Sequence, residues 1–239
     1  MAYDFDKIAH AYDRLNRIMT LGIDRLWRRR AVRLVVDGAR GAANGKSSAP
    51  RVLDVACGTG DVVAELLKNR CLVTGIDLSE EMLAVARHKC STLPAADLAP
   101  ASPVFQIANA EQLPFPDGAF DAVTCAFGVR NFVHLEQGLA EMLRVLKPDG
   151  RMVILEMATP DSPLVKPLYN LYTRHIIPWL GSRLAGNREA YTYLPASIAR
   201  FPKGEVFLNI VRSLGADASQ RKFTFGVCRM YVITKRPLR

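Results

Sequence analysis

From residue 51 onward, short runs of β-branched and apolar residues alternate with amphipathic stretches of helical character. The runs that predict strands are 51–56, 71–77, 104–109, 120–127 and 151–157. Because helical stretches lie between them, the pattern is typical of βαβ units on a parallel sheet. Two further β-rich runs, 221–226 and 228–235, follow one another almost directly and predict an antiparallel pair. We therefore expect an α/β fold with a doubly wound, mostly parallel sheet of seven strands and helices on both faces.

Three amphipathic stretches, 61–69, 79–90 and 135–147, predict the helices between these strands. The length of the chain suits one domain over residues 1–239. Its expected parts are an N-terminal helical segment, a Gly-, Ala- and Ser-rich loop, the ligand-binding core, a proline-punctuated helical insert, and a C-terminal helix with the strand pair, at residues 1–36, 37–50, 51–157, 158–200 and 201–239.

The composition excludes several classes of protein. With 49% hydrophobic and 23% charged residues, the chain can bury a core, which excludes wholesale disorder and a fibrous architecture. No apolar stretch approaches the roughly 20 residues that cross a bilayer, and the acidic start MAYDFDKIAH does not resemble a signal peptide. We therefore expect a cytoplasmic protein. The five cysteines lack CxxC or Cys/His spacing, so neither a disulfide framework nor a metal site is expected.

Basic residues are concentrated in two parts of the chain. Between Arg25 and Arg51 there are eight basic residues and one acid, and from Arg200 to Arg239 there are nine basic residues and two acids. Such patches attract polyanions, either nucleic acid or the anionic surface of a membrane. A solvated surface without a partner explains them equally well.

A glycine turn follows the first predicted strand, in the segment Val52-Leu-Asp-Val-Ala-Cys-Gly58-Thr-Gly60. In an open α/β sheet, ligands bind beyond the carboxyl ends of the strands, where Gly58 and Gly60 let the backbone approach a ligand closely. The next strand ends in Asp77, 17 residues after Gly60, where a carboxylate can accept hydrogen bonds from both ribose hydroxyls. This combination predicts a nucleoside-containing ligand.

Two residues distinguish the kind of nucleoside. The dinucleotide-binding fingerprint requires a third small residue, but Val63 occupies that position. Asp54 stands just before the turn, where it suits a ligand with a cationic amino group and would repel a pyrophosphate. Both features favour S-adenosylmethionine over NAD.

Polar residues follow the third and fourth predicted strands as well. Asn109 could hydrogen-bond an adenine amino group, or it could simply cap the following turn. Arg130 and Asn131 follow the fourth strand and are expected over the same crevice, although an arginine is by base rate a surface charge.

The sequence closely resembles the ubiquinone/menaquinone biosynthesis C-methyltransferases, the UbiE/MenG group, over nearly the whole chain. The N-terminal IAHAYDRLNRIMTLGIDRLWRR matches that family's YDxxNxxxxxGxxRxW pattern. The central segments VLDVACGTGD, GIDLSEEML, ANAEQLPFPDGAFD, FGVRN and RVLKPDGRMVILE follow in the family's order, and YTYLPASIARFP resembles its YxYLPxSxxxFP segment. The resemblance implies a class I, Rossmann-like methyltransferase fold and S-adenosylmethionine as the cofactor, with S-adenosylhomocysteine as its product.

The resemblance also implies roles for particular residues. Thr59, Asp77, Asn109 and Ala110 would be cofactor-binding positions, whereas Ala126 stands where some relatives carry a serine that offers a hydroxyl. The substrate would be a demethylated quinone with a polyprenyl tail, methylated at a ring carbon in its reduced form. Demethylmenaquinol is one such substrate, and the equivalent ubiquinone precursor is another.

For the chemistry, Arg130 and Asn131 are expected to be the catalytic residues. A guanidinium can lower the pKa of the phenol and stabilise the phenolate, while the amide orients the ring or a water. Because arginine is effectively never deprotonated, the proton acceptor is expected to be water. Tyr12 is expected either to line the pocket near the reacting methyl or to belong to the core.

Aromatic residues of the insert would either roof an apolar channel for ring and tail or simply pack a small subdomain: Tyr169, Tyr172, Trp179, Tyr191 and Tyr193. A greasy substrate suggests peripheral contact of the basic patches with anionic lipid at the inner face of the cell membrane. Self-association is common in the family, so a homodimer is one expectation, and no nucleic acid is expected. The alternatives left open are a methyltransferase for RNA or another small molecule, and a cofactor-binding scaffold without catalysis.

Overall fold

The computed structural model describes residue 6 and residues 9–42, 49–94, 101–177 and 188–236 of the chain. Its centre is a seven-stranded sheet of order β3-β2-β1-β4-β5-β7-β6. The strands are β1 (Arg51–Val55), β2 (Leu72–Asp77), β3 (Val104–Ile107), β4 (Phe120–Ala126), β5 (Leu146–Met157), β6 (Ala216–Phe223) and β7 (Cys228–Lys235). Only β7 runs antiparallel to its neighbours. The predicted mostly parallel α/β sheet with an antiparallel closing strand is therefore confirmed.

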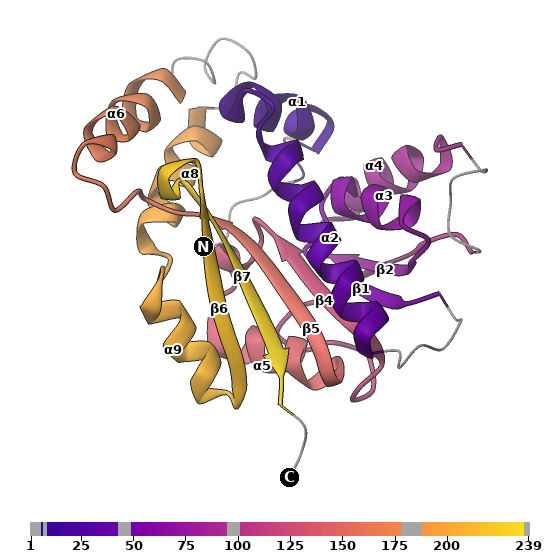
Figure 1. Ribbon diagram of the computed structural model, residues 1–239. Coiled ribbons are helices and arrows are strands. Elements are labelled where there is room, and N and C mark those ends of the chain that lie inside the picture. Colours follow the sequence, from indigo (N-terminus) through magenta and orange to yellow (C-terminus); the bar gives the residue numbers. More distant parts are fainter. Residues whose placement is uncertain (1–5, 7–8, 43–48, 95–100, 178–187, 237–239) are drawn as a thin grey trace.

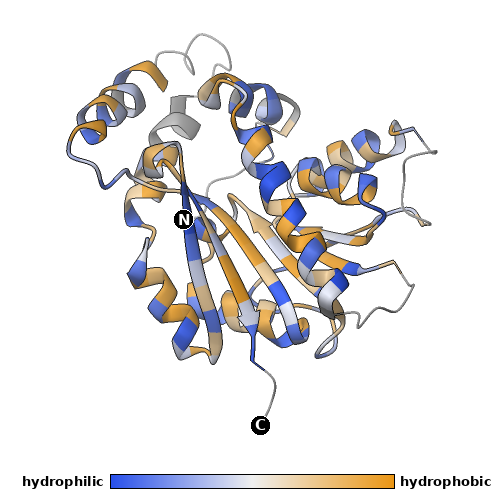
Figure 2. Ribbon diagram, viewed as in Figure 1, coloured by the Kyte–Doolittle hydropathy of each residue, from blue (hydrophilic) through white to orange (hydrophobic). Residues whose placement is uncertain are grey.

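Helices cover both faces of this sheet (Figure 1). On one face, α2 (Asp24–Ala42), α3 (Asp61–Lys68) and α4 (Glu80–Ser91) bury a cluster that includes Val52, and on the other, α5 (Leu135–Val145) and α9 (Glu205–Ser213) bury a cluster that includes Leu53. Successive strand side chains point to opposite faces, so a strand covered twice must be apolar throughout. Figure 2 shows this for the central strands, whereas the edge strand β6 is more hydrophilic.

The N-terminal segment departs from the prediction in two ways. It forms two helices, α1 (Ala9–Thr20) and α2, because the chain turns at Leu21 and Gly22, which adopt φ of 52° and 76°. The second helix also runs to Ala42, five residues beyond the predicted start of the loop at 37. Gly38 does not break it, because a Cβ there would lie 2.4 Å from the Cβ of Arg151 on β5, so this glycine lets the helix pack closely on the sheet.

The C-terminal strand pair also begins earlier than predicted. The strand β6 starts at Ala216 and not at residue 221, and Thr224–Gly226 form the 3₁₀ turn η5 between the two strands. The polar residues of β6 are exposed except for the half-buried Gln220, which is typical of an edge strand and gives a weak sequence signal. The predicted helices between the strands are confirmed, including Ser79 as N-cap of α4, where its Oγ accepts from the Met82 N–H.

The insert is helical, as predicted, and gathers with α1 at the end of the sheet where β4 and β5 stop (Figure 1). It contains α6 (Val165–Leu171), the π-helical turn η4 (Tyr172–Ile176) and α8 (Arg188–Arg200). The short helix η3 (Val129–Asn131) follows β4 at the same end. Trp179 lies outside the described residues, as does the side chain of Tyr191. Among the described helices, none combines the length and apolar character of a membrane span.

Candidate functional site

The glycine turn after β1 lies beside a cavity, and the backbone of the turn borders that cavity directly. Ala56, Gly58 and Gly60 all have positive φ, so the chain reverses sharply between β1 and α3. A Cβ on Gly58 would meet nothing within 4 Å, which leaves its backbone open to a ligand. A Cβ on Gly60 would lie 2.9 Å from the Cβ of Ala86, so this second glycine is needed for packing of α3 against α4.

Asp77 lies directly against this turn, as the sequence predicts. Its Oδ2 accepts a hydrogen bond from the Gly58 N–H at 2.8 Å, and its Oδ1 accepts one from the Ser79 N–H at 3.0 Å. Burial raises the pKa of the Asp77 carboxyl, and the surrounding amide hydrogen bonds oppose that rise. The carboxylate is thus held in one orientation, and each oxygen retains a lone pair for a further donor such as a ribose hydroxyl.

Asp54 is the most unusual group of the site. It is 1% exposed, and neither carboxylate oxygen has a hydrogen-bond partner among the described residues. Burial, reinforced by the nearby charge of Asp77, raises its pKa well above the ordinary value, although Arg28 acts in the opposite direction. It borders a small cavity of about 30 Å³ beside Gly58 and Thr59. A buried carboxyl without a partner fits a cationic ligand group, so these acceptor oxygens suit the amino group of S-adenosylmethionine, which would donate to them.

A cavity of about 310 Å³ continues from the turn across the ends of the neighbouring strands. We call it the first cavity, and its lining includes Asp77, Asn109, Ala110, Ala126 and Asn131. The Oδ1 of Asn109 accepts from the Glu111 N–H at 2.9 Å, so this residue does cap the following turn while it also borders the cavity. The structure therefore brings together most of the sequence-predicted cofactor positions.

Thr59, a predicted cofactor-binding position, is hydrogen-bonded to α1 through its side chain. Its hydroxyl donates to the Asp13 carboxylate on α1, and the Lys89 Nζ lies 3.3 Å away, so the hydroxyl is directed toward α1. The side chain is buried with 3% exposure and borders only the small cavity beside Asp54.

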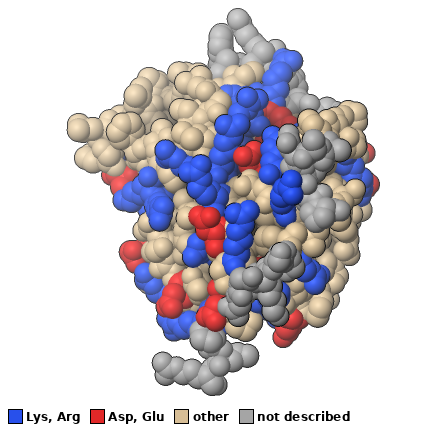
Figure 3. All heavy atoms as spheres, turned by 45° about the vertical axis from the view of Figure 1, so that its right-hand side comes forward, with Lys and Arg blue, Asp and Glu red and all other residues tan. Residues whose placement is uncertain are grey.

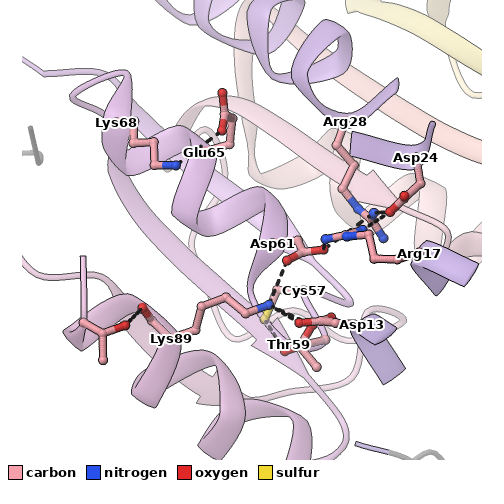
Figure 4. A network of polar contacts seen from close by, with 12 residues as sticks. Asp13, Arg17, Asp24, Arg28, Cys57, Thr59, Asp61, Glu65, Lys68 and Lys89 are labelled. Atoms are coloured by element: carbon pink, nitrogen blue, oxygen red, sulfur yellow. Dashed lines mark hydrogen bonds and ion pairs between the residues drawn. The ribbon is translucent and has the colours of Figure 1, made fainter. Parts of the chain in front are cut away.

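Thr59 belongs to a polar network that sequence reasoning missed, shown in Figure 4. Lys89 of α4 contacts Asp13 at 2.5 Å and Asp61 at 2.7 Å, and Asp61 also accepts from Arg17 at 2.5 Å. Burial alone would raise the pKa of Asp61, but Arg28, Lys89 and Arg17 lower it to about 2. This network fastens α1 to the start of α3, beside the glycine turn. Its members are polar residues of ordinary helices, so only their three-dimensional arrangement reveals it.

A second cavity of about 450 Å³ lies between the α1–α2 turn, α6, η4, α8 and η5. Its lining is almost wholly apolar and includes Met19, Trp27, Met157, Leu168 and Ile198. Tyr169 and Tyr172 of the insert line it as well, which supports the predicted roof over an apolar channel for these two aromatic residues.

Tyr12 and Phe127 line both cavities. Phe127 follows β4 with φ of 64°, and its backbone N–H donates to the Leu155 carbonyl at 2.7 Å. A non-glycine residue in this conformation costs free energy that the surroundings must supply, and such residues cluster at functional sites. Its aromatic ring marks the junction of the two cavities, as does the ring of Tyr12.

Arg130 is not a surface residue, because 5% of its side chain is exposed. Its Nη1 contacts the Oε1 of Glu156 at 2.7 Å and also donates to the Phe127 carbonyl. Burial lowers the pKa of the guanidinium, but Glu156 together with Tyr12 and Tyr193 raises it above its ordinary value on balance. The Nε–H has no acceptor among the described residues, although Arg130 borders the second cavity. Sequence reasoning missed Glu156, and its one signal was an acid within the apolar run RMVILEM.

Asn131 lines the first cavity, and its Oδ1 accepts a hydrogen bond from the Tyr193 hydroxyl of α8 at 2.9 Å. The insert thus orients the amide that follows β4. Tyr193 borders neither the first nor the second cavity, so among the described aromatic residues of the insert its role is separate from that of a roof.

The basic segments are used unequally. Figure 3 shows lysine and arginine side chains gathered on the face that carries α1 and α2, where Arg25, Arg29, Arg30, Arg33 and Arg40 are exposed. The C-terminal basic residues are largely paired, with Arg229, Lys203 and Lys222 all contacting Asp161. Among the described residues, no group of three or more His, Cys, Asp or Glu side chains is arranged to hold a metal ion.

Comparison with known proteins gives a consistent result. Residues 2–235 match the model of the ubiE/COQ5 methyltransferase family. A demethylmenaquinone methyltransferase of Deinococcus radiodurans is 44% identical over 97% of this chain and 91% of its own length. A ubiquinone/menaquinone biosynthesis C-methyltransferase UbiE of Geobacter sulfurreducens is 44% identical over 95% of this chain and 85% of its own.

Among solved structures, a SAM-dependent methyltransferase of Thermotoga maritima, described as a possible histamine N-methyltransferase, matches with a TM-score of 0.59 and 17% identity. The match covers 97% of this chain and 98% of that one. At this identity the likeness shows the fold, which is that of the SAM-dependent methyltransferases.

Proposed function

Because the chain belongs to the ubiE/COQ5 methyltransferase family, we propose that it transfers the methyl group of S-adenosylmethionine to a ring carbon of a reduced polyprenyl quinone. Relatives with about the same length carry the names demethylmenaquinone methyltransferase and UbiE. The conversion is thus of the type demethylmenaquinol to menaquinol, with the equivalent ubiquinone precursor as a second substrate. The observation that carries the proposal is the junction at Tyr12 and Phe127 of a polar-edged cavity with an apolar one.

The first cavity fits the cofactor. Asp77 would accept from the ribose hydroxyls, Asn109 and Ala110 would border the adenine, and the backbone at Gly58 would let the nucleoside approach. Asp54, buried and without a partner, would pair with the amino group of the methionine part. When bound, S-adenosylmethionine supplies an electrophilic methyl group on a positively charged sulfur.

The second cavity fits the ring and the first part of its apolar tail. A quinol carbon becomes nucleophilic as an adjacent hydroxyl loses its proton, so a group near that hydroxyl must stabilise the phenolate. Arg130 is already neutralised by Glu156, and its contribution is therefore a directed hydrogen bond from the unpaired Nε–H. Alignment of the two reactants is worth up to about 7–11 kcal/mol in the best intramolecular cases, which makes the shape of the junction the larger contribution.

The proton acceptor is water in this account. Burial raises the pKa of Tyr169 to about 12, so this phenol stays protonated at neutral pH and does not serve as a base. Asn131, oriented by Tyr193, would hold either the ring hydroxyl or the accepting water. Tyr12 would pack beside the reacting methyl, since it borders both cavities.

The function is tested by incubating the protein with methyl-labelled S-adenosylmethionine and one acceptor at a time. The acceptors are reduced demethylmenaquinone, the corresponding benzoquinol and RNA. We expect label in the quinol fraction and none in RNA. Label in RNA would favour the nucleic-acid alternative, whereas intact cofactor binding without transfer to any acceptor would favour a scaffold without catalysis.

Electrostatic contact with a membrane is a further part of the proposal. The exposed arginines of α2 form a cationic face, and each such residue near an anionic bilayer contributes about 1 kcal/mol of attraction. Flotation with anionic vesicles at low and high salt tests it, and flotation independent of both lipid charge and salt would contradict it. The cytoplasmic location and the homodimer stay predictions.

A further inference from the structure

Large apolar side chains are exposed around the second cavity. Of the 13 exposed large hydrophobic residues in the described parts of the chain, six also line that cavity, which is far more than a scattered distribution would place there. We call these six the apolar rim: Leu21, Ile23, Leu168, Leu171, Ile176 and Phe225. Leu26 and Leu164, which are 48% and 88% exposed, lie next to the rim in sequence without lining the cavity.

Folding does not account for the rim. Leu21 and Phe225 are 83% and 79% exposed, so their side chains add little to the core. Both also have positive φ, at 52° and 57°, a conformation in which glycine and asparagine are favoured. An apolar residue at such a position is unfavourable twice, once for its backbone and once for its exposure. A surface that selects apolar side chains against these costs is one that meets an apolar partner.

The rim combines three separate segments at the mouth of one cavity. They are the α1–α2 turn, the α6–η4 helix and the η5 turn, and the cavity that they surround is the one proposed for a quinol with a polyprenyl tail. Exposed cations flank the rim, with Arg25 next to Leu26 on α2 and Lys166 on α6. An apolar centre bordered by cations is the arrangement that binds the interface of an anionic bilayer.

We propose that the apolar rim inserts its side chains into the interface of a lipid bilayer, so that the second cavity opens directly into the membrane. This inference rests on the proposed function for the identity of the tail, and it assigns the bilayer contact to residues separate from the α2 arginines. The quinol then moves from the acyl chains into the cavity without crossing water, while the exposed arginines steer the approach.

The test uses the full chain and vesicles of phosphatidylcholine with phosphatidylglycerol. Binding is measured at about 0.1 M NaCl and at about 0.5 M NaCl, and the higher concentration screens the charge attraction. In the rim variant Leu21→Asn/Leu168→Gln/Phe225→Asn, asparagine suits positive φ and glutamine suits a helix. The control variant Val104→Thr/Val206→Gln removes two exposed valines outside the rim. At high salt, we expect the rim variant to bind vesicles at least tenfold more weakly than the wild type does. The control variant should bind as tightly as the wild type.

Three outcomes overturn the proposal. One is vesicle binding by the rim variant equal to that of the wild type, and another is a wild type that binds no vesicles. The third is a wild-type dimer that the rim substitutions convert to a monomer, since the rim would then cover a second copy of the chain. The thermal midpoint of unfolding serves as the control for folding and is expected not to fall in the rim variant.

A second variant separates this proposal from the proposed function. Leu26→Gln/Leu164→Gln alters residues that border the rim but do not line the cavity. We expect it to lower methyl transfer to long-tailed quinol in vesicles several-fold and to leave transfer to a short-tailed quinol in solution unchanged. Equal loss on both quinols would contradict delivery from the bilayer. A wild type inactive on both would contradict the proposed function and leave the vesicle-binding result to stand alone.

Discussion

At the scale of single residues, the site contains buried charged groups whose hydrogen bonding is incomplete in the fold. Asp54 has no partner, Asp77 is held by two backbone amides, and Arg130 has one nitrogen without an acceptor. A buried polar group without a partner costs about 1–3 kcal/mol, which a ligand that supplies the partner returns on binding. These residues are therefore where substitutions should exchange stability for function.

Asp54→Asn should stabilise the protein without its cofactor and weaken cofactor binding. Because burial raises the folded-state pKa of Asp54, the unfolded state loses its proton first, and stability is full below about pH 4 and falls as pH rises. The neutral amide removes that loss, so the free energy of unfolding at pH 8 should rise by about 1–3 kcal/mol. Urea unfolding measures it with and without S-adenosylhomocysteine. A variant that is less stable at pH 8 but binds the cofactor normally would contradict the assignment.

Asp77→Ala should abolish cofactor binding, and Asp77→Asn should weaken it about 10–100-fold, since hydrogen bonds to a charged group are worth about 1.5–3 kcal/mol. Calorimetric titration with S-adenosylhomocysteine measures the affinity. Glu111→Gln is a suitable control, because Glu111 also borders the first cavity but lies in the following turn. Normal affinity in Asp77→Ala would remove this residue from the cofactor site.

The proposed role of Arg130 implies that its substitution stops turnover and spares cofactor binding, but any such substitution also isolates buried Glu156. Breaking a buried pair by removing one partner costs about 3–5 kcal/mol. We predict that Arg130→Met has a much lower free energy of unfolding than the wild type, whereas Arg130→Met/Glu156→Gln regains most of that free energy. Both should bind S-adenosylhomocysteine when folded and lack turnover. Turnover near the wild-type rate in the double variant would contradict the role of the Arg130 Nε–H.

At the scale of elements, the network of Figure 4 holds α1 beside the glycine turn of the proposed cofactor site. Helix α1 carries Tyr12, which borders both cavities, and is fastened by Asp13 and Arg17 to residues beside the glycine turn. Position and mobility of α1 should therefore follow the state of these ion pairs.

Lys89→Met should loosen α1, because it leaves Asp13 and Asp61 close together without the cation between them. We expect about tenfold weaker binding of S-adenosylhomocysteine and faster tryptic cleavage at Arg14. Lys68→Met is the matched control, since Lys68 of α3 is 48% exposed and lies 3.9 Å from Glu65 of the same helix, outside the network. Equal effects of the two substitutions would contradict a specific role for the network.

The same network should make the free energy of unfolding depend on pH in the acidic range. Because the folded-state pKa of Asp61 is lowered to about 2, its contribution is present above the unfolded pKa and is lost as pH falls from about 5 toward 2. The loss amounts to about 2 kcal/mol. Urea unfolding across this range should show a smaller slope for Asp61→Asn than for the wild type, and identical slopes would place the acid sensitivity elsewhere.

The elements also show what the sequence can and cannot predict. The order of strands and helices was predictable, because doubly covered strands such as β1 and β4 are short, mostly apolar runs. The break at Leu21 and the length of α2 were not, since Gly38 acts through its contact with Arg151, far away in sequence. Likewise, Asp54 and Asp77 follow from strand ends, whereas the pairing of Arg130 with Glu156 requires the three-dimensional structure.

At the scale of the whole molecule, a polar-edged cavity and an apolar cavity adjoin each other at one end of the sheet. The carboxyl ends of β1, β2 and β4 carry the polar-edged first cavity, while α1, α6, η4 and α8 enclose the apolar one. In the proposed reaction, the nucleoside and the apolar ring would meet where the two cavities join, at Tyr12 and Phe127. The apolar rim lies toward this end, and the exposed arginines extend away from it along the length of α2 (Figure 1).

A crystal structure of the protein with S-adenosylhomocysteine tests this account most directly. We expect the ribose hydroxyls on the Asp77 carboxylate and the amino group near Asp54. The sulfur should lie within about 4 Å, the ordinary contact distance, of Tyr12 or Phe127. A nucleoside bound away from the glycine turn, or a sulfur facing away from the second cavity, would contradict it.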